Sequence, residues 1–559
     1  MKKLRELILE LAVRGKLVPQ DSIDEPASVL LEKIAEEKAR LIKEGKIKKQ
    51  KRLPEISDEE KPFELPVGWE WTRLGTIALI NPRNAAEDNS MVSFVPMPLV
   101  TTSHTGEHGQ EEREWGRIKK GYTHFANGDI GLAKITPCFE NSKAVVFFGL
   151  KNGIGAGTTE LHVARPFGTT LFSRFVLLYL KSPQFLHLGQ SKMTGTAGQK
   201  RVPKSFFAEN PFPLPPIIEQ HRIVANVDEL MALCDRLEQQ QTNSNTTHQA
   251  LLETLLATLT TAADHDEFAG AWQRIQGHFH TLFTTEQSID QLKQTILQLA
   301  VMGKLVPQDP EDEPASILLE KIAKEKARLI KVGKIKKQKK LQEISEEDKP
   351  FDLPRGWEWA KIGDIYHFLN GYAFKSEWFK SAGIKLLRNI NILHGDTRWV
   401  DVAYVAESKA RGFETYALNK GDIVLSLDRP IINTGLKYAV ISEQDLPCLL
   451  LQRVAKFHSI GDYILPRFLT TWLESVFFIL KIDPGRSNGV PHISTKQIGN
   501  MVFALPPLAE QHRIVAKVDG LMALCNTLKT RISEAQTTQI HLADTMVEQA
   551  VSREADRDD

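Results

Sequence analysis

The chain contains two blocks that each occur twice, and this internal duplication limits its fold more than any other feature. Residues 11–71 match residues 299–359 at an offset of 288, with 49 of 61 positions identical. Residues 219–234 match residues 510–525 in 14 of 16 positions. Two copies are too few for a repeat solenoid, in which about three or more units stack. The duplication instead predicts an internal pseudo-dimer around an approximate two-fold axis.

Between the duplicated blocks lie two segments that have almost nothing in common. Residues 72–212 and 360–503 are of similar length but show almost no identity. Each mixes short runs typical of strands with longer apolar stretches typical of helices. The predicted strands lie at 129–133, 144–148, 422–427 and 437–442, and the predicted helices at 172–180 and 463–478. The predicted fold class is therefore mixed α/β, with two different globular modules on a duplicated frame.

The frame is predicted to be helical. Shorter helices are expected at 1–14, 26–44, 288–302 and 314–332, and each copy of the second block is expected to form the beginning of a long helix. In the long helices apolar residues recur at alternating steps of four and three, which is typical of a coiled-coil seam. The predicted helix-pairing residues are Ile223, Val227, Leu230, Cys234 and Leu237 in the first copy and Ile514, Val518, Leu521, Cys525 and Leu528 in the second.

The first seam continues at Leu251 and Leu255, beyond a polar stretch around Gln241. Polar residues in a seam cost stability but can fix its register. An alternative interpretation is that each long helix packs on its own module instead of on the other helix.

Composition leaves several classes of protein open and excludes others. The net charge is +1, with 71 basic and 70 acidic residues, so any DNA-binding surface must be a local patch. Four widely spaced cysteines, with no C-x-x-C pair, argue against a disulfide framework or a zinc site. No apolar stretch approaches the roughly 18 residues of a membrane span. The start of the chain does not resemble a signal peptide, and a cytoplasmic location is expected.

Motifs of catalysis are missing from the sequence. It has no G-x-x-x-x-G-K-[ST] phosphate-binding loop, no H-E-x-x-H and no G-x-S-x-G. The nearest string to an adenine-methyltransferase N-P-P-[YF] loop is Asn210-Pro211-Phe212-Pro213, which lacks the second proline in place. We therefore expect no catalytic residues, no metal site and no cofactor bound by this chain.

The duplicated motifs carry a family resemblance. The string L-P-P-x-x-E-Q-H-R-I-V before each long helix and the G-K-L-V-P-Q-D block together resemble type I restriction–modification specificity subunits. The resemblance covers essentially the whole chain. It implies two target-recognition domains, each reading one half of a bipartite, asymmetric DNA target, separated by two long antiparallel coiled-coil helices that act as a ruler.

The resemblance also implies partners and domain limits. Two modification (methyltransferase) subunits would bind S-adenosylmethionine, and restriction subunits would cleave DNA with ATP and Mg²⁺, while this chain reads double-stranded DNA and scaffolds the complex. The predicted domains are an N-terminal duplicated region (1–71), a first target-recognition domain (72–218), a first spacer helix (219–262), a central linker with the second duplicated region (263–359), a second target-recognition domain (360–509) and a second spacer helix (510–559).

Candidate DNA-binding residues lie in loops of both modules. Arg and Lys suit guanine edges and phosphates, and Asn and Gln suit adenine. The candidates are Lys134, Thr136, Asn141, Lys143, Gln199, Lys200 and Arg201 in the first module and Tyr372, Lys375, Arg388, Asn389, Arg429, Asn433, Arg486 and Asn488 in the second. Two other interpretations stay open: a coiled-coil scaffold that presents two protein-binding modules without DNA specificity, and an enzyme with an unrecognised site.

Overall fold

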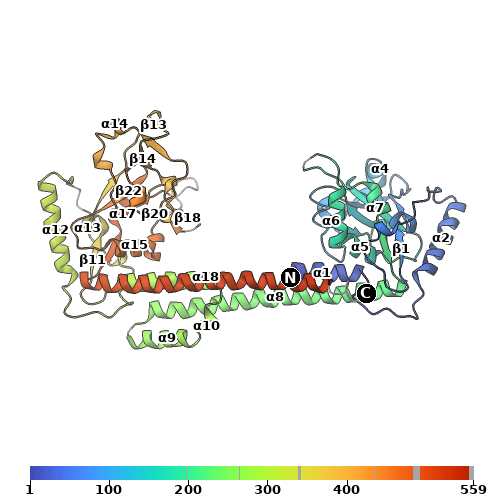
Figure 1. The fold of residues 1–559 in the computed structure, drawn as a ribbon, viewed down its shortest axis with the longest axis horizontal. Helices are drawn as coiled ribbons and strands as arrows, with labels where there is room; N and C mark the ends of the chain where they lie inside the picture. The colour runs from blue at the N-terminus through green and yellow to red at the C-terminus, as the bar shows by residue number, and fades with distance from the viewer. Residues whose placement is uncertain (197, 264, 338–340, 434, 483–491, 553–559) are drawn as a thin grey trace. The chain divides into compact units, whose positions relative to one another are not determined.

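The computed structural model describes residues 1–196, 198–263, 265–337, 341–433, 435–482 and 492–552. Its contacts divide the chain into two units, one of Met1–Ser244 with Gln539–Asp559 and the other of Asn245–Thr538. Each unit holds one sheet-rich module together with part of each long helix (Figure 1). The mixed α/β fold with two sheet-rich modules and long helices is confirmed. The finer domain limits stay a prediction.

The first module contains three small sheets. One has the order β2-β9-β6-β7 and another the order β4-β3-β8-β5, while β1 pairs with β10 where the chain enters and leaves the module. The strands are β1 (Glu70–Arg73), β2 (Ala78–Ile80), β3 (Met91–Val95), β4 (Glu111–Glu114), β5 (Thr123–Ala126), β6 (Ile130–Ala133), β7 (Ala144–Val146), β8 (Ile154–Gly157), β9 (Leu161–Pro166) and β10 (Pro211–Leu214).

The second module repeats this plan with different strands. Its larger sheets have the orders β12-β22-β17-β20-β15 and β13-β16-β14-β21, and β11 pairs with β23 as β1 does with β10. The strands are β11 (Glu358–Lys361), β12 (Tyr366–Asn370), β13 (Phe379–Lys380), β14 (Ile384–Leu387), β15 (His394–Gly395), β16 (Ala403–Val405), β17 (Ile423–Ser426), β18 (Ile431–Ile432), β19 (Gly435–Leu436), β20 (Tyr438–Val440), β21 (Cys448–Leu450), β22 (Val454–Ser459) and β23 (Val502–Leu505).

Helices form the frame and one layer of each module. The frame helices are α1 (Lys2–Val13), α2 (Ala27–Lys43), α8 (Ile217–Thr261), α11 (Glu286–Val301), α12 (Ala315–Lys331) and α18 (Leu508–Ser552). The module helices used below are α5 (Ser173–Lys181), α6 (Pro183–Lys192), α7 (Lys204–Glu209), α15 (Pro466–Glu474), α16 (Val476–Ile479) and α17 (Thr495–Asn500).

The duplicated motifs meet in one hydrogen-bonded network at the base of the first module. The indole Nε1 of Trp69 donates to Glu219 Oε2 at 3.0 Å, and Gln20 Nε2 donates to Glu219 Oε1 at 3.2 Å. Gln20 also donates to the carbonyl of Gly15 at 2.6 Å. The V-P-Q, G-W and E-Q-H-R motifs, which are far apart in sequence, therefore share a single buried site.

The second copy builds the same network with the same side chains. Trp357 Nε1 donates to Glu510 Oε2 at 2.9 Å, and Gln308 Nε2 donates to Glu510 Oε1 at 3.1 Å. In both copies burial raises the pKa of the glutamate, and the Trp and Gln hydrogen bonds oppose that rise. Every partner of the carboxylate is therefore duplicated, and the two copies of the blocks build the same buried contact.

Glycine is required where α1 and α11 end. Gly15 and Gly303 have φ of +70° and +71°, in the left-handed region that favours glycine. A Cβ on Gly15 would lie 2.5 Å from Pro66 Cγ, and one on Gly303 would lie 2.5 Å from Pro354 Cγ. The duplicated G-K-L-V-P-Q motif thus fixes both the helix end and its close approach to the duplicated proline and tryptophan.

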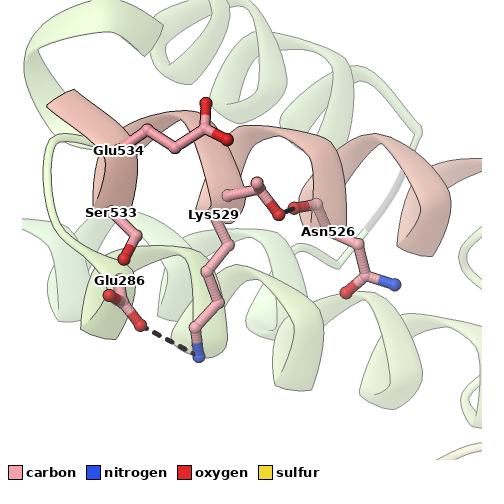
Figure 2. Close-up of a pocket in the computed structure, with 6 residues that line it drawn as sticks. Glu286, Asn526, Lys529, Ser533 and Glu534 are labelled. Carbon is pink, nitrogen blue, oxygen red and sulfur yellow. Dashed lines mark hydrogen bonds and ion pairs between the residues drawn. The ribbon is translucent and has the colours of Figure 1, made fainter.

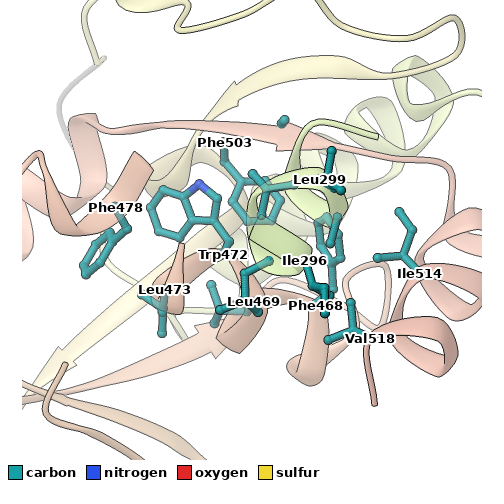
Figure 3. Packing of buried hydrophobic residues seen from close by; sticks show 14 of the residues in the cluster. Ile296, Leu299, Phe468, Leu469, Trp472, Leu473, Phe478, Phe503, Ile514 and Val518 are labelled. Carbon is teal, nitrogen blue, oxygen red and sulfur yellow. The ribbon is translucent and has the colours of Figure 1, made fainter. Parts of the chain in front are cut away.

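The structure assigns packing partners to the predicted helix-pairing residues that differ from those predicted. In the first unit Ile223, Val227 and Cys234 are buried in one cluster with residues of α1 and α5. In the second unit Ile514 and Val518 are buried with residues of α11 and α15, as Figure 3 shows. These first turns of α8 and α18 thus cover the helices of their own units, as the alternative interpretation describes.

The other predicted helix-pairing residues differ in how deeply they are buried. Leu230 packs against the cluster of the first unit, and Leu521, Cys525 and Leu528 belong to or pack against that of the second. Leu237, in contrast, is 45% exposed.

The far part of the seam on α8 is displaced by one residue from the prediction. Leu252, Leu256 and Leu259 are buried in the second unit, in the same cluster as Ile514 and Val518, whereas Leu251 is 51% exposed. Extending a strict heptad from Leu237 by 14 residues leads to Leu251. A straight helix has 3.6 residues per turn, so five turns from buried Cys234 lead to Leu252. In the second unit α8 and α18 therefore share one core.

Candidate functional site

In the first module three loops join beside the end of β6. The backbone N–H of Thr136 donates to Lys200 O at 3.0 Å, and that of Val202 donates to Lys134 O at 2.8 Å. Lys134 N–H in turn donates to Glu160 O at 2.9 Å. The loop after β6, the residue before β9 and the segment before α7 are thereby held together. We call this group of residues, 134–136, 160 and 199–201, the first loop cluster.

An ion pair fixes the first loop cluster. Arg201 Nε and Nη2 donate to the two carboxylate oxygens of Glu160, both at 2.9 Å. The hydrogen bonds from Arg201 lower the pKa of the Glu160 carboxyl. The predicted candidate Arg201 therefore serves first to orient the loops, while its neighbours Gln199 and Lys200 are exposed.

Asn141 and Lys143 lie on another side of the same β6–β7 connection. Lys143 Nζ donates to the carbonyl of Met97 at 3.2 Å. Both residues line a cleft of about 730 Å³ together with residues of α1, including Arg5, and with Lys181 of α5. The predicted candidates of the first module are thus divided between the first loop cluster and this cleft.

In the second module Asp428 gathers three side chains just after β17. Its carboxylate accepts hydrogen bonds from Asn389 Nδ2 at 3.2 Å and from Arg453 Nη1 at 3.0 Å. His492 Nδ1 lies 2.7 Å from the other carboxylate oxygen. We call Asn389, Asp428, Arg429, Arg453 and His492 the second loop cluster. The side chains of Arg453 and His492 are exposed, whereas that of Asp428 is only 15% exposed.

The two loop clusters occupy equivalent places in the two modules. Ile135 forms an isolated β-bridge with Arg201, and Asp428 forms one with His492. Glu160 directly precedes β9, and Arg453 directly precedes β22, which holds the same place beside β17 as β9 does beside β6. The residue before this strand is acidic in the first module and basic in the second, and its ion-pair partner lies on a different loop: Arg201 before α7 in the first module and Asp428 after β17 in the second. The same backbone scaffold therefore presents different chemistry.

Two other candidates of the second module have side-chain partners. Arg388 hydrogen-bonds to the Asp401 carbonyl and forms a 3.2 Å ion pair with its carboxylate. Tyr372 packs in an aromatic group with Phe374, Phe413 and Tyr416, at ring-centroid distances of 4.6–5.4 Å.

The remaining candidates lie in loops. Lys375 Nζ lies over the Trp378 ring, 5.8 Å from its centroid. Arg429 is exposed and has φ of +48°, and Asn433 is exposed in the loop between β18 and β19. Arg486 and Asn488 lie outside the described residues.

The structure adds members that sequence reasoning missed. Asp428, Arg453 and His492 were not among the candidates, and neither was Glu160. A signal was present for Asp428, because a charged Asp-Arg pair directly follows a buried strand. His492 and Arg453 had no such signal, since they join the cluster only through the fold.

The described part of the chain contains no group of three or more His, Cys, Asp or Glu residues placed to hold a metal ion. None of its helices is both long enough and apolar enough to cross a membrane.

Comparisons with known proteins give consistent matches. Residues 354–536 match the family model of the type I restriction modification DNA specificity domain. The chain is 64% identical over 553 residues to the type I restriction enzyme EcoAI specificity subunit of Escherichia coli, covering 99% of this chain and 94% of that protein. It is 49% identical over 560 residues to the EcoEI specificity subunit of Escherichia coli, with the same coverage of both.

A solved structure is similar in fold. It is described as "Structural basis underlying complex assembly and conformational transition of the type I R-M system". Its TM-score is 0.50 at 18% identity, covering 88% of this chain and 99% of that chain. At that identity the likeness concerns the fold alone.

Proposed function

Because the chain belongs to the family of type I restriction–modification specificity subunits, the non-catalytic components that give these complexes their DNA target specificity, we propose that it reads a bipartite and asymmetric DNA target with one half-site per module. The observation that carries this proposal is the equivalence of the two loop clusters. They lie at matching positions of matching sheets, yet their side chains differ, as two unlike half-sites require.

Each cluster combines an oriented ion pair with polar groups suited to DNA. A carboxylate that accepts a hydrogen bond from an arginine or asparagine side chain holds that side chain in one orientation. It thereby fixes the direction in which the other N–H donors of the same side chain point. In the second cluster Asp428 would orient Arg453 and Asn389, whose free donors suit guanine and adenine edges. In the first cluster the exposed Gln199 and Lys200 would take these roles beside the Glu160–Arg201 pair. Lys134 suits a phosphate contact, which positions without specifying.

Exposed apolar residues on the long helices support a scaffolding role. Several large apolar side chains of α8 and α18 are between 43% and 63% exposed, although each lies within a continuous helix: Leu233, Leu237, Leu251, Leu524, Ile540, Leu542 and Met546. Helices of partner subunits would cover them, because exposed apolar stretches mark interaction sites. The partners in this proposal are two modification subunits and the restriction subunits. S-adenosylmethionine, ATP and Mg²⁺ would be bound by those partners, in the cytoplasm.

Substitutions in the loop clusters test the proposal. The chain would be co-expressed with its modification subunits in cells that lack other adenine methyltransferases, and methylated sites would be mapped across the genome. Asp428→Asn removes the charge that orients Arg453, so we expect relaxed preference at one to three bases of a single half-site. A lost bidentate base contact costs about 1–3 kcal/mol, or about fivefold to 160-fold in discrimination. Glu160→Gln should relax only the other half-site.

The matched control is Asp462→Asn, the same change at an exposed aspartate of the second module. It should leave the methylated motif unchanged. If both cluster variants methylate the original motif with the original preference, the loop clusters do not read DNA. If no motif is methylated and the wild-type complex binds random duplexes without preference in gel shifts, the protein-binding scaffold without DNA specificity becomes the better interpretation.

A further inference from the structure

A basic groove lies beside α2 in the first unit. It has a volume of about 780 Å³ and is bounded by the second half of α2, by the segment that follows this helix and by β1. Its charged lining residues are mostly cations: Lys38, Lys49, Lys51, Arg52, Lys61 and Arg73, against Glu55 and Glu70. Because the whole chain has a net charge of only +1, the groove is a local concentration of positive charge.

The segment 46–54, which carries several of these cations, is held in place at both ends. Ile47 packs against the core of the first unit. At the other end the buried Arg73 donates from Nε to the carbonyl of Pro54 at 2.9 Å and from Nη2 to that of Glu55 at 3.1 Å. The backbone that presents the lysines is therefore fixed by contacts in which the lysines take no part.

Two other lysines of the frame have carboxylate partners. Lys529 of α18 lies 2.6 Å from Asp290 and 3.8 Å from Glu286 of α11, and Figure 2 shows it reaching Glu286. Lys33, in the first half of α2, lies 2.6 Å from Glu25. The positive charge of both lysines is thus balanced within the chain.

The lysines of the groove segment differ in this respect. Lys48, Lys49 and Lys51 are exposed, and within the described part of the chain none of them has an ion pair or a side-chain hydrogen bond. Of the five carboxylates between residues 41 and 61, four already have cationic partners: Glu44 with Lys46, Glu55 with Arg52, Asp58 with Lys61 and Glu60 with Arg73. Unbalanced cations on a fixed backbone favour a polyanion, since phosphates that they neutralise release their counterions.

The groove lies close to the first loop cluster. Gly75, in its wall, lies between Leu53 and α7, because an added Cβ would come within 3.1 Å of both Leu53 Cδ1 and the Ala208 carbonyl. The loop cluster ends at Arg201, just before α7 begins. Since α7 has six residues, about 9 Å of helix separates the cluster from the groove wall. That length corresponds to about three base-pair steps of DNA.

We propose that the groove holds the phosphate backbone of DNA beside the half-site that the first module reads. The proposal rests on the proposed function, because it needs the duplex to pass the first loop cluster. Lysines suit this role, since a phosphate contact positions the duplex without specifying its sequence. The groove thus strengthens binding to all sequences alike, while discrimination between sequences belongs to the loop clusters.

The lining of the groove favours DNA over a protein partner. Protein interfaces have an apolar centre from which charged residues are depleted. Among the described lining residues of the groove, no large apolar side chain is exposed, whereas Lys49, Lys51 and Arg52 are.

The salt dependence of DNA binding tests the groove separately from target recognition. The chain would be assembled with its modification subunits, and its affinity for a random duplex and for a duplex with the methylated target would be measured over a range of KCl concentrations. Lys49→Gln with Lys51→Gln should lower the slope of log affinity against log salt by about 2, since each phosphate contact contributes about 0.9. At about 0.1 M KCl, both affinities should fall about 10-fold to 50-fold. The methylated motif should stay the same.

Two control variants separate the place of the charge from its amount. Lys49→Arg with Lys51→Arg keeps both charges in the groove and should keep the wild-type slope. Lys33→Gln with Lys324→Gln removes two charges from exposed lysines of α2 and α12 that lie outside the groove and have the partners Glu25 and Glu320. This variant should also keep the wild-type slope.

The proposal is overturned if the groove variant, Lys49→Gln with Lys51→Gln, has the same slope as the variant of Lys33 and Lys324. It is also overturned if the groove variant binds DNA as wild type does but loses its modification subunits in size-exclusion chromatography, because the groove would then hold an acidic protein surface. A wild-type complex with equal affinity for both duplexes would instead contradict the proposed function, and the difference in slope would still test the groove.

Discussion

At the residue scale, one buried lysine of the first unit opposes folding. Lys181, at the end of α5, is 4% exposed and donates from Nζ to the carbonyl of Ser142 at 2.7 Å. Burial lowers the pKa of Lys181 to about 7. Its side chain lines the cleft that contains Asn141 and Lys143. A buried ammonium with one hydrogen bond is a cost to folding that the module carries at neutral pH.

Lys181→Met is expected to stabilise the first unit in a pH-dependent way. Below pH 7 both folded and unfolded chains hold the Lys181 proton, so the full burial cost is present. Between pH 7 and about 10.4 the unfolded chain holds more protons, so wild-type stability rises with pH. The variant should therefore exceed wild type by about 1–3 kcal/mol at pH 6.5, and this advantage should shrink towards pH 9.5. Urea unfolding at both pH values measures it.

The exposed Lys192→Met on α6 is the control and should show no such pH dependence. A stability difference between Lys181→Met and wild type that stays constant from pH 6.5 to 9.5 would show that the Lys181 ammonium is hydrated.

At the scale of elements, the frame is stabilised by a network that each copy repeats in full. Glu219 and Glu510 head the long helices, and each accepts from a tryptophan and a glutamine of its own duplicated block. Arg222 and Arg513, in the next turn, pair with Asp24 and Asp312 at 2.6 Å each. The beginning of each long helix is thereby attached to the short helices and to the module base.

Removing either glutamate should weaken its own unit by the same amount. Glu219→Ala leaves the buried indole N–H of Trp69 without an acceptor and removes one acceptor of the Gln20 amide, which keeps its hydrogen bond to Gly15, at a cost of about 2 kcal/mol. Glu510→Ala should cost as much, because its partners and distances match. Hydrogen exchange by mass spectrometry, resolved by unit, should show the loss of protection in the altered unit only. Glu229→Gln, an exposed site on α8, is the control. Unequal losses would mean that the two networks differ in ways their geometry does not reveal.

At the scale of the whole molecule, one frame carries two unlike modules. The duplicated blocks build matching networks, whereas the segments 72–212 and 360–503 supply different loop clusters on similar sheets. We therefore expect the residues that differ between the copies to determine what each module binds. The residues that are the same in both copies determine how each module is attached to the frame.

Replacing residues 72–212 by the corresponding segment of a relative with another target should therefore change one half of the methylated motif. The frame contacts of Trp69 and Glu219 lie outside the exchanged segment, so the unit should still fold. Methylome sequencing of cells with the hybrid chain and its modification subunits gives the readout. A motif altered in both halves would show that the two modules read DNA jointly.

Much of this molecule follows from local sequence. The duplication, the strands at 129–133 and 422–427, the long helices and the absence of catalytic motifs need no tertiary information, because periodicity and identity act over short distances. Several candidates, among them Lys134, Thr136, Asn389 and Arg429, also fall in the loop clusters, since loops after buried strands carry exposed polar groups.

What the tertiary structure alone decided is which residues become neighbours. An apolar stripe specifies a face and not its partner, so Ile223 and Ile514 were expected to pair with each other and instead lie in the cores of separate units. Leu252 is buried and Leu251 exposed, because a straight helix departs from a heptad over five turns. Asp428 meets Arg453 and His492 only because three loops converge on one strand end. Charge and periodicity are properties of the chain, whereas contact depends on the path that the whole chain takes.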